Sequence, residues 1–240
     1  MRLIGLLNYI YTLKMKTLTL LFSLFLMCPL SVWGQSADEL LSKVSDALSE
    51  GKDDYAVSLF RQAANAGEDR TEMFYWTNVD KSSEVAPRLA DVLAVHYKEM
   101  RNYDKAYLFY KEFLQRHPED VPALVSCAEM EMMRGKEKDA VKTYEKVLML
   151  DANNLQANIF LGSYYYLQAE REKKKLEDDY KKITSPTRMQ YARYRNGLSD
   201  VYSNVYSKAK DYLQRVLQLF PSTEAGNTLE KIRKLEAEIK

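Results

Sequence analysis

Apolar residues recur at intervals of three and four along most of the chain after residue 36, with polar residues between them. This spacing places apolar side chains on one face of an α-helix, whereas a half-buried strand alternates strictly. Glycines and short polar clusters interrupt the pattern repeatedly, which predicts helices joined by tight turns. The expected helices include roughly 37–50, 71–79, 88–100, 103–116, 123–134 and 137–150.

The helical pattern repeats itself in a register of 34 residues between 87 and 168. Such self-similarity is typical of stacked helical hairpins, each of which needs its neighbours to bury its apolar face. Tyr97 and Tyr165 stand two intervals apart, with Glu131 at the position between them. The other equivalent positions are Leu93, Cys127 and Leu161; Ala94, Ala128 and Gly162; Ala106 and Ala140; and Tyr110 and Tyr144.

These residues resemble the tetratricopeptide repeat, whose pattern is W-x2-L-G-x2-Y, then A-x3-F and a closing P. The chain lacks the opening Trp, carries Glu131 in place of one Tyr, and carries Ala152 in place of one Pro. The resemblance implies an all-α fold, a right-handed α-solenoid of helical hairpins that binds other proteins. The expected repeats are about 37–70, 87–120, 121–154 and 155–221.

Two segments interrupt the 34-residue register. The first, residues 71–86, contains Phe74-Tyr75-Trp76, and three consecutive aromatics on a helix leave at least one partly exposed unless another element covers it. The second, residues 170–204, continues the helical pattern, so both helices of the last repeat are expected to extend into an antiparallel arm. At 1.5 Å per residue the arm would project roughly 20–25 Å. Ser185-Pro186 is interpreted as the cap and first position of its returning helix.

After Pro221 closes the last repeat, a stripe at Ala225, Leu229, Ile232 and Leu235 predicts a helix over 222–240 with Ser222 as its cap. We expect it to close the open end of the stack. A helix that docks a partner is the alternative.

The first 34 residues are interpreted as a signal peptide. A basic start at Lys16, an apolar run over 18–30 and small residues before Gln35 predict export and cleavage. Residues 1–14 are interpreted as the product of an upstream start codon chosen in error. A retained membrane anchor is the alternative, although the run is shorter than the roughly 20 apolar residues that span a bilayer. Bulky residues before Cys28 argue against a lipoprotein.

Composition excludes several functions. From Gln35 onward, 32 Lys and Arg face 34 Asp and Glu, so no overall field attracts nucleic acid. The two histidines, His96 and His117, lack partners at metal-ligand spacing, and no phosphate loop or catalytic motif is present. We therefore expect neither catalysis, nor a metal, nor a cofactor. Cys127 occupies a core position and is expected to be buried and unreactive.

The resemblance assigns the inner groove to the first helix of each repeat. Val125, Ile159, Met133 and Leu167 stand where carboxylate-clamping members carry Lys or Asn, so a clamp is not expected. An apolar groove instead suits an amphipathic helix or apolar peptide, because thioethers adapt their shape. The alternative is that the chain fills the groove itself, with Phe74-Tyr75-Trp76. The predicted groove residues are Val125, Glu129, Met132, Met133, Ile159, Ser163 and Tyr166.

The sequence thus favours a non-catalytic adaptor exported to the periplasm or envelope of a Gram-negative bacterium. Uneven apolar stripes on the arm predict that Tyr191 or Tyr194 stays exposed and contacts a partner. A structural subunit that forms homo-oligomers through the arm is the alternative function. Basic residues on the arm are interpreted as a solvated helix face, because acidic residues lie among them, and a nucleic-acid or lipid patch is the alternative.

Overall fold

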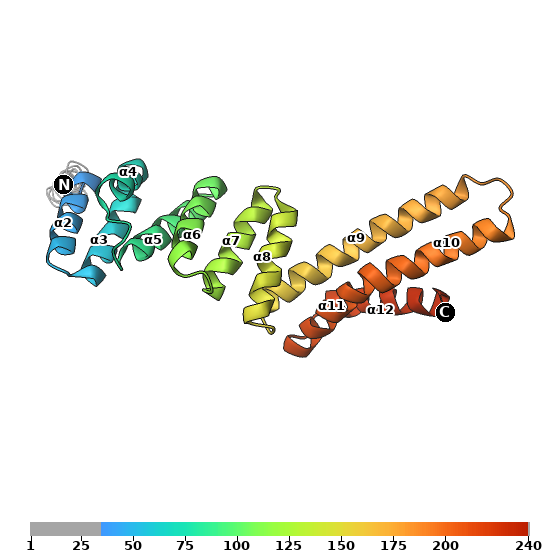
Figure 1. Cartoon of the computed structure of the whole chain (residues 1–240). Coiled ribbons are helices and arrows are strands. Elements are labelled where there is room, and N and C mark those ends of the chain that lie inside the picture. Colours follow the sequence, from blue (N-terminus) through green and yellow to red (C-terminus); the bar gives the residue numbers. More distant parts are fainter. Residues whose placement is uncertain (1–34, 240) are drawn as a thin grey trace, which may run out of the picture. The chain divides into compact units, whose positions relative to one another are not determined.

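The computed structural model describes residues 35–239, so the predicted signal peptide, 1–34, lies outside the described residues. The described residues form helices and turns with no strand among them, which confirms the all-α prediction (Figure 1). None of these helices is long and apolar enough to cross a membrane. In chain order they are α2 (Ala37–Ser49), α3 (Asp53–Ala66), α4 (Glu68–Asn78), α5 (Ala86–Glu99), α6 (Tyr103–Arg116), α7 (Val121–Met133), α8 (Glu137–Leu150), α9 (Leu155–Lys181), α10 (Arg188–Val201), the π-helical turn η1 (Tyr202–Tyr206), α11 (Ser207–Leu219) and α12 (Thr223–Ile239).

The helices pack as consecutive hairpins. Helix α2 pairs with α3, α5 with α6, α7 with α8, and α9 with α11, while α3 contacts α5, α6 contacts α7, and α8 contacts α9. Each hairpin therefore buries its apolar face against its neighbours, as a helical-repeat protein requires. Helix α4 is added between the first two hairpins and contacts α2, α3 and α5.

The repeat register is visible in the backbone at the turn inside each hairpin. Gly51, Arg101 and Gly135 all adopt positive φ, at 69°, 58° and 71°. In each case the N–H of the residue after the positive-φ position donates to the carbonyl oxygen five residues before that donor, at 2.8–2.9 Å. This hydrogen bond closes the helix in a Schellman motif. Arg101 and Gly135 are one register apart, and the next equivalent position is Ala169. There the chain does not turn: α9 continues to Lys181, and the arm begins.

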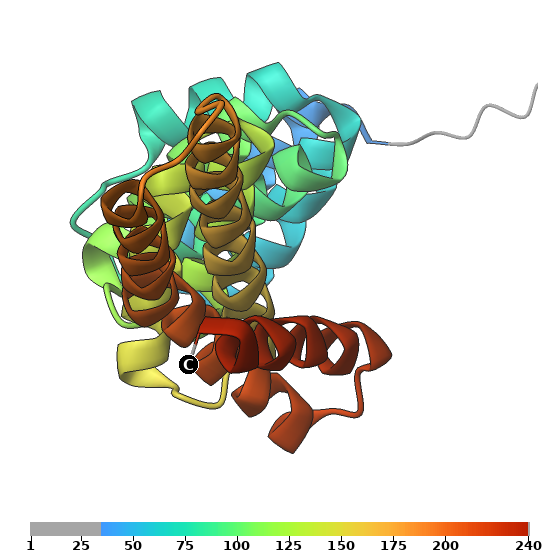
Figure 2. The same ribbon diagram turned by 90° about the vertical axis from the view of Figure 1, so that its right-hand side faces the viewer.

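The arm consists of the second half of α9 and the returning helix α10, which lie side by side (Figures 1 and 2). The predicted cap at Ser185 is wrong. Thr187 caps α10 instead, in a reciprocal capping box with Gln190, because this pair satisfies two backbone donors that Ser185 followed by Pro186 would leave open.

The π-helical turn η1 was not predicted. Buried residues at this junction are spaced by four, at Val201, Val205, Ala209 and Leu213, which exceeds the 3.6 residues of an α-turn. A π turn takes up one additional residue. It therefore keeps the apolar stripe of the arm continuous with that of α11.

Tyrosine hydroxyls donate to glutamates between helices throughout the stack. Tyr165 donates to Glu145 at 2.8 Å and Tyr206 to Glu170 at 2.5 Å. At the position equivalent to Tyr165 in the third hairpin, buried Glu131 accepts a bond from Thr143 at 2.7 Å. Burial raises the pKa of Glu131 above its ordinary value, because the charged form loses water.

Helix α12 packs against α11 and α10, as a helix that closes the stack would. The Ser222 hydroxyl accepts the Ala225 N–H at 3.2 Å, which confirms the predicted cap. Ala225, Leu229 and Ile232 are buried, so the predicted apolar stripe faces the stack.

Candidate partner-binding surfaces

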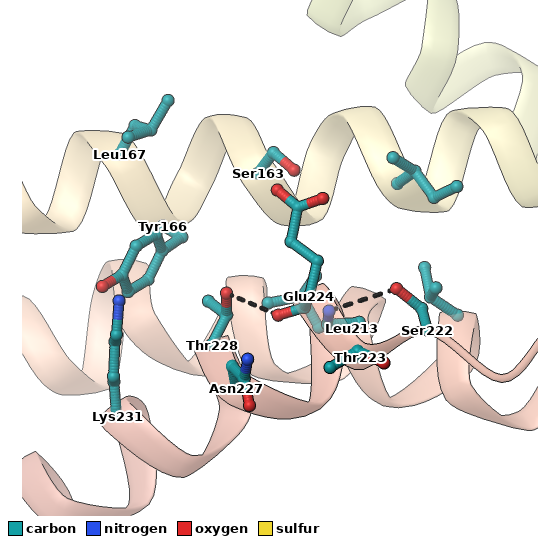
Figure 3. Close-up of a pocket in the computed structure, with 13 residues that line it drawn as sticks. Ser163, Tyr166, Leu167, Leu213, Ser222, Thr223, Glu224, Asn227, Thr228 and Lys231 are labelled. Atoms are coloured by element: carbon teal, nitrogen blue, oxygen red, sulfur yellow. Dashed lines mark hydrogen bonds between the residues drawn. The ribbon is translucent and has the colours of Figure 1, made fainter.

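A cavity of about 660 Å³ lies between α9 and α12 (Figure 3). Helix α9 contributes Ile159, Ser163, Tyr166 and Leu167, so three of the predicted groove residues share one wall. Leu213 of α11 lies at the base, and α12 supplies the opposite wall. Ile159 and Leu167 are 45% and 52% exposed, so this wall presents apolar surface to solvent.

The α12 wall is polar, and its role in the cavity was not predicted from the sequence. Because Leu229 points into the core, the helical period directs Glu224, Thr228 and Lys231 toward the cavity, which buried Ala225 also lines. The signal was present in the spacing, but the helix was interpreted chiefly as a cap, with partner docking as the alternative, and these polar residues were assigned to no cavity. The α12 segment contributes Thr223, Glu224, Asn227, Thr228 and Lys231, after Ser222 in the preceding turn.

The Tyr166 hydroxyl is a hydrogen-bonding group in the α9 wall of the cavity. Burial and nearby Glu170 raise the pKa of Tyr166, so its hydroxyl stays protonated and can donate a hydrogen bond at neutral pH. In Figure 3 the Lys231 side chain extends toward the Tyr166 ring. Two apolar side chains facing a row of polar ones match an amphipathic ligand.

The predicted groove residues on α7 divide into three kinds, and the α9–α12 cavity includes none of them. Val125 and Met132 are partly buried and pack in the core of the third and fourth hairpins. Glu129 pairs with Lys98 at 2.5 Å and accepts a bond from Gln156.

Glu129 therefore links three successive first helices, because Lys98 lies on α5 and Gln156 on α9. This polar row joins the helices across the inner face. Met133 is 62% exposed at the end of α7 and is free to contact a ligand.

The aromatic group on α4 packs between the first two hairpins and does not line the α9–α12 cavity. Tyr75 is buried, with its ring edge-on to Phe109 of α6 at 5.5 Å and its hydroxyl bonded to Glu112 at 3.4 Å. Trp76 stacks on Phe109 and stays partly exposed, as the sequence predicted.

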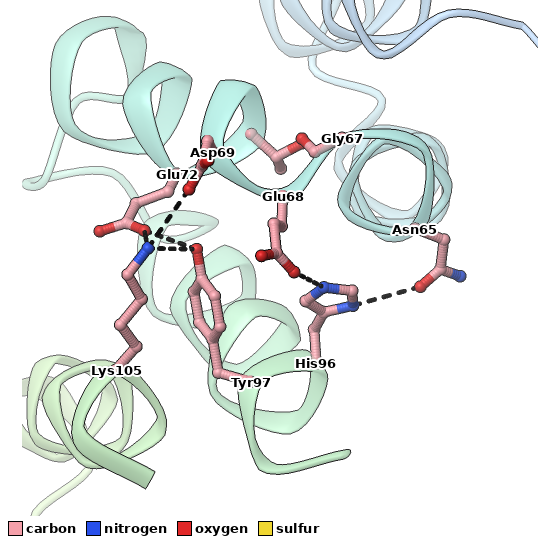
Figure 4. A network of polar contacts seen from close by, with 9 residues as sticks. Asn65, Gly67, Glu68, Asp69, Glu72, His96, Tyr97 and Lys105 are labelled. Carbon is pink, nitrogen blue, oxygen red and sulfur yellow. Dashed lines mark hydrogen bonds and ion pairs between the residues drawn. The ribbon is translucent and has the colours of Figure 1, made fainter. Parts of the chain in front are cut away.

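A polar network fastens α4 to the hairpin of α5 and α6 (Figure 4). The Tyr97 hydroxyl donates to Glu72 at 2.5 Å, and Lys105 pairs with the same carboxylate at 2.7 Å. His96 lies 3.3 Å from Glu68 and 3.2 Å from Asn65. These contacts join α4 to both helices of the next hairpin.

The two predicted arm tyrosines differ. Tyr194 stacks on Tyr180 with ring centroids 4.6 Å apart and nearly parallel planes. Tyr191 is 50% exposed and only tilts against Tyr180, at 6.2 Å. The structure thus places Tyr194 in the seam between α9 and α10 and leaves Tyr191 on the surface.

Reactive chemistry is sparse among residues 35–239. No group of three or more His, Cys, Asp or Glu side chains is arranged to hold a metal. Cys127 is buried, and burial raises the pKa of its thiol to about 12, so the reactive thiolate is disfavoured.

Fold and surfaces together define a tetratricopeptide-like helical-repeat protein, a class whose members bind other proteins along their inner face. Comparison with solved structures gives a match at 60% sequence identity and a TM-score of 0.77. The match covers 86% of this chain and 100% of the other, which is the crystal structure of "a putative protein binding protein" from Bacteroides ovatus ATCC 8483. The chain belongs to the same family as this Bacteroides ovatus protein.

A second solved structure is much less similar to this chain. A thermophilic TPR protein from Thermus thermophilus matches at 13% identity over 84% of this chain and all of its own, with a TM-score of 0.31. No protein-family model matches the sequence, and no curated protein matches it.

Proposed function

We propose that this protein is a non-catalytic adaptor of the bacterial envelope that binds an apolar or amphipathic segment of a partner protein between α9 and α12. The observation that carries this proposal is the cavity, which combines exposed Ile159 and Leu167 with the polar row of α12. The description of the Bacteroides ovatus relative as protein binding supports it. Export rests on the sequence pattern of residues 1–34.

An amphipathic helix fits this arrangement because its apolar stripe can cover α9 while its polar flank meets Thr228 and Lys231. Helix-in-groove recognition uses anchors at helical spacing. Met133 on α7 extends the apolar surface along the inner face, so the bound segment would run from α12 toward α7.

Site-specific photo-crosslinking tests the proposal. A photo-reactive amino acid replaces Ser163 in the cavity wall, and the same amino acid at Met149, which is 79% exposed on α8, is the matched control. In cells, residue 163 should give an adduct with a discrete apolar or amphipathic peptide. Residue 149 should not.

The variant Ile159→Glu should reduce the adduct at least tenfold, because it places a charge where an apolar anchor binds. Its melting temperature should stay within about 3 °C, since Ile159 is already half exposed. Equal adducts at both positions, or an adduct that Ile159→Glu leaves unchanged, would contradict the cavity as the binding site.

A further inference from the structure

The end of the arm differs in charge from the rest of the chain. Residues 180–195, here called the arm tip, contain five Lys and Arg and no Asp or Glu. The remainder of 35–240 contains 27 basic and 34 acidic residues. The acidic residues of the arm lie before the tip, from Glu170 to Asp179, or after it, at Asp200. Positive charge is therefore concentrated at the distal end of the hairpin.

Three of the five cations are available to a ligand. Lys181, Arg188 and Arg193 are exposed and take part in none of the ion pairs formed within residues 35–239. The other two are engaged. Lys182 pairs with Asp179 at 2.8 Å, and Arg195 donates to two backbone carbonyls at the end of α12, both at 2.7 Å.

Apolar side chains accompany these cations. Met189 is 80% exposed and Tyr191 is half exposed, one turn or less from the start of α10. Met189 and Arg193 are four residues apart and share one helix face. Exposed Met and Tyr beside Lys and Arg form the composition of a membrane-interfacial surface, in which apolar groups enter the headgroup boundary and cations remain above it.

Side-chain contacts join the two helices at the tip, so this surface is largely preorganised. Stacked Tyr180 and Tyr194 join the two helices, and the Thr187 capping box fixes the start of α10. Below them the Leu176 side chain packs on Gly197, where an added Cβ would lie 3.1 Å from a Leu176 methyl. A preorganised tip loses little conformational entropy when it docks.

We propose that the arm tip binds an anionic lipid surface, with Met189 and Tyr191 entering the interface and Lys181, Arg188 and Arg193 contacting headgroups. The tip is the convex end of a hairpin (Figure 1). A peptide partner needs a pocket that excludes water around its anchors, whereas lipid conforms to a convex end. This site is separate from the α9–α12 cavity and does not depend on the function proposed for it.

Vesicle co-sedimentation tests the proposal with the chain from Gln35 onward, the predicted mature protein, and phosphatidylcholine vesicles that contain or lack phosphatidylglycerol. The tip variant is Lys181→Glu/Arg188→Glu/Arg193→Glu. The control, Lys43→Glu/Lys138→Glu/Arg233→Glu, makes the same change in net charge at exposed positions away from the tip. Residues 1–34 are left out of every variant, so that their apolar run and Trp33 add no vesicle binding or emission of their own.

Each Lys or Arg near an anionic surface contributes about fivefold to partitioning, so the tip variant should bind anionic vesicles at least tenfold more weakly than wild type. The control should change less than twofold, and added salt should weaken wild-type binding. A second variant, Met189→Trp, should show a blue-shifted emission that brominated lipid quenches on anionic vesicles.

Several results would overturn the proposal. These are equal vesicle binding by the tip variant and wild type, equal binding of wild type to neutral vesicles, and a Trp at position 189 that brominated lipid does not quench. A tip variant that instead changes the mass of the protein in solution, with vesicle binding intact, would assign the tip to contacts between copies of the chain.

Discussion

The two insertions in this chain obey the same sequence pattern but have opposite structural outcomes. Residues 71–86 fall between two repeats, and the helix they complete, α4, packs into the stack with Tyr75 buried. Residues 170–204 fall inside a repeat, at its turn, and project as an arm with Met189 and Tyr191 exposed. The position of an insertion relative to the hairpin turn decides which result follows.

The physical reason lies in what each position offers. Between repeats, an added helix meets the apolar faces of two hairpins and can cover both, so α4 joins their common core. At a turn, added residues only lengthen two helices that already face each other. The lengthened helices gain each other as partners, and α12 covers only part of α10, so part of their surface stays exposed. The first insertion stabilises the stack, and the second provides a surface.

The largest expected effect concerns the packed insertion. Tyr75→Ala should lower the free energy of unfolding by about 3–5 kcal/mol, because it removes a fully buried ring together with its contact with Phe109. Urea unfolding followed by circular dichroism measures this. Met73→Ala, on the same helix but 51% exposed, is the matched control and should cost less than about 1 kcal/mol. Similar losses in both variants would mean that α4 is not part of the core.

A second prediction compares the stack with the arm through three glycines. A Cβ at Gly162 would lie 2.9 Å from Leu213 at the junction of α9 and α11, so Gly162→Ala should cost about 1–2 kcal/mol despite its better helix propensity. At Gly197 the nearest contact is a Leu176 methyl at 3.1 Å, which the less crowded arm can move. Gly197→Ala should change stability by less than about 0.5 kcal/mol.

Gly226→Ala in α12 is the reference for both substitutions. A Cβ there would meet nothing within 4 Å, so Gly226→Ala should stabilise the protein by about 0.5–1 kcal/mol through helix propensity alone. Thermal and urea unfolding of the three variants give the comparison. Equal destabilisation by Gly162→Ala and Gly197→Ala would show that the arm is packed as tightly as the stack.

Much of the fold could be predicted because the repeat register constrains it. The bounds 103–116 and 137–150 were predicted to the residue, since turns with polar residues or Gly135 stand on both sides. The arm was predictable because residues 170–204 lengthen the last repeat by about one register and keep the helical spacing of apolar residues. The π turn η1 was not predictable, because it depends on how two apolar stripes meet in three dimensions.

The candidate site was only half predictable. The register placed Ile159, Ser163 and Tyr166 on one helix face, and they do share a wall of the cavity. The register says nothing about the opposite wall, since α12 follows no repeat and its position depends on packing against α10 and α11. The sequence also could not show that Glu129 pairs with Lys98 and accepts a hydrogen bond from Gln156, because these side chains meet only when α5, α7 and α9 pack side by side.

The arm tip is expected to contribute little to stability. Residues 181–193 can be replaced by a short glycine turn that still joins stacked Tyr180 and Tyr194 and keeps Arg195 bonded to α12. Nearly all the removed side chains are exposed, so the free energy of unfolding should fall by less than about 1 kcal/mol, and helicity per residue should not change. Urea unfolding and far-ultraviolet circular dichroism measure both. A loss above about 3 kcal/mol would mean that the tip supports the stack as α4 does, and the contrast between the two insertions would fail.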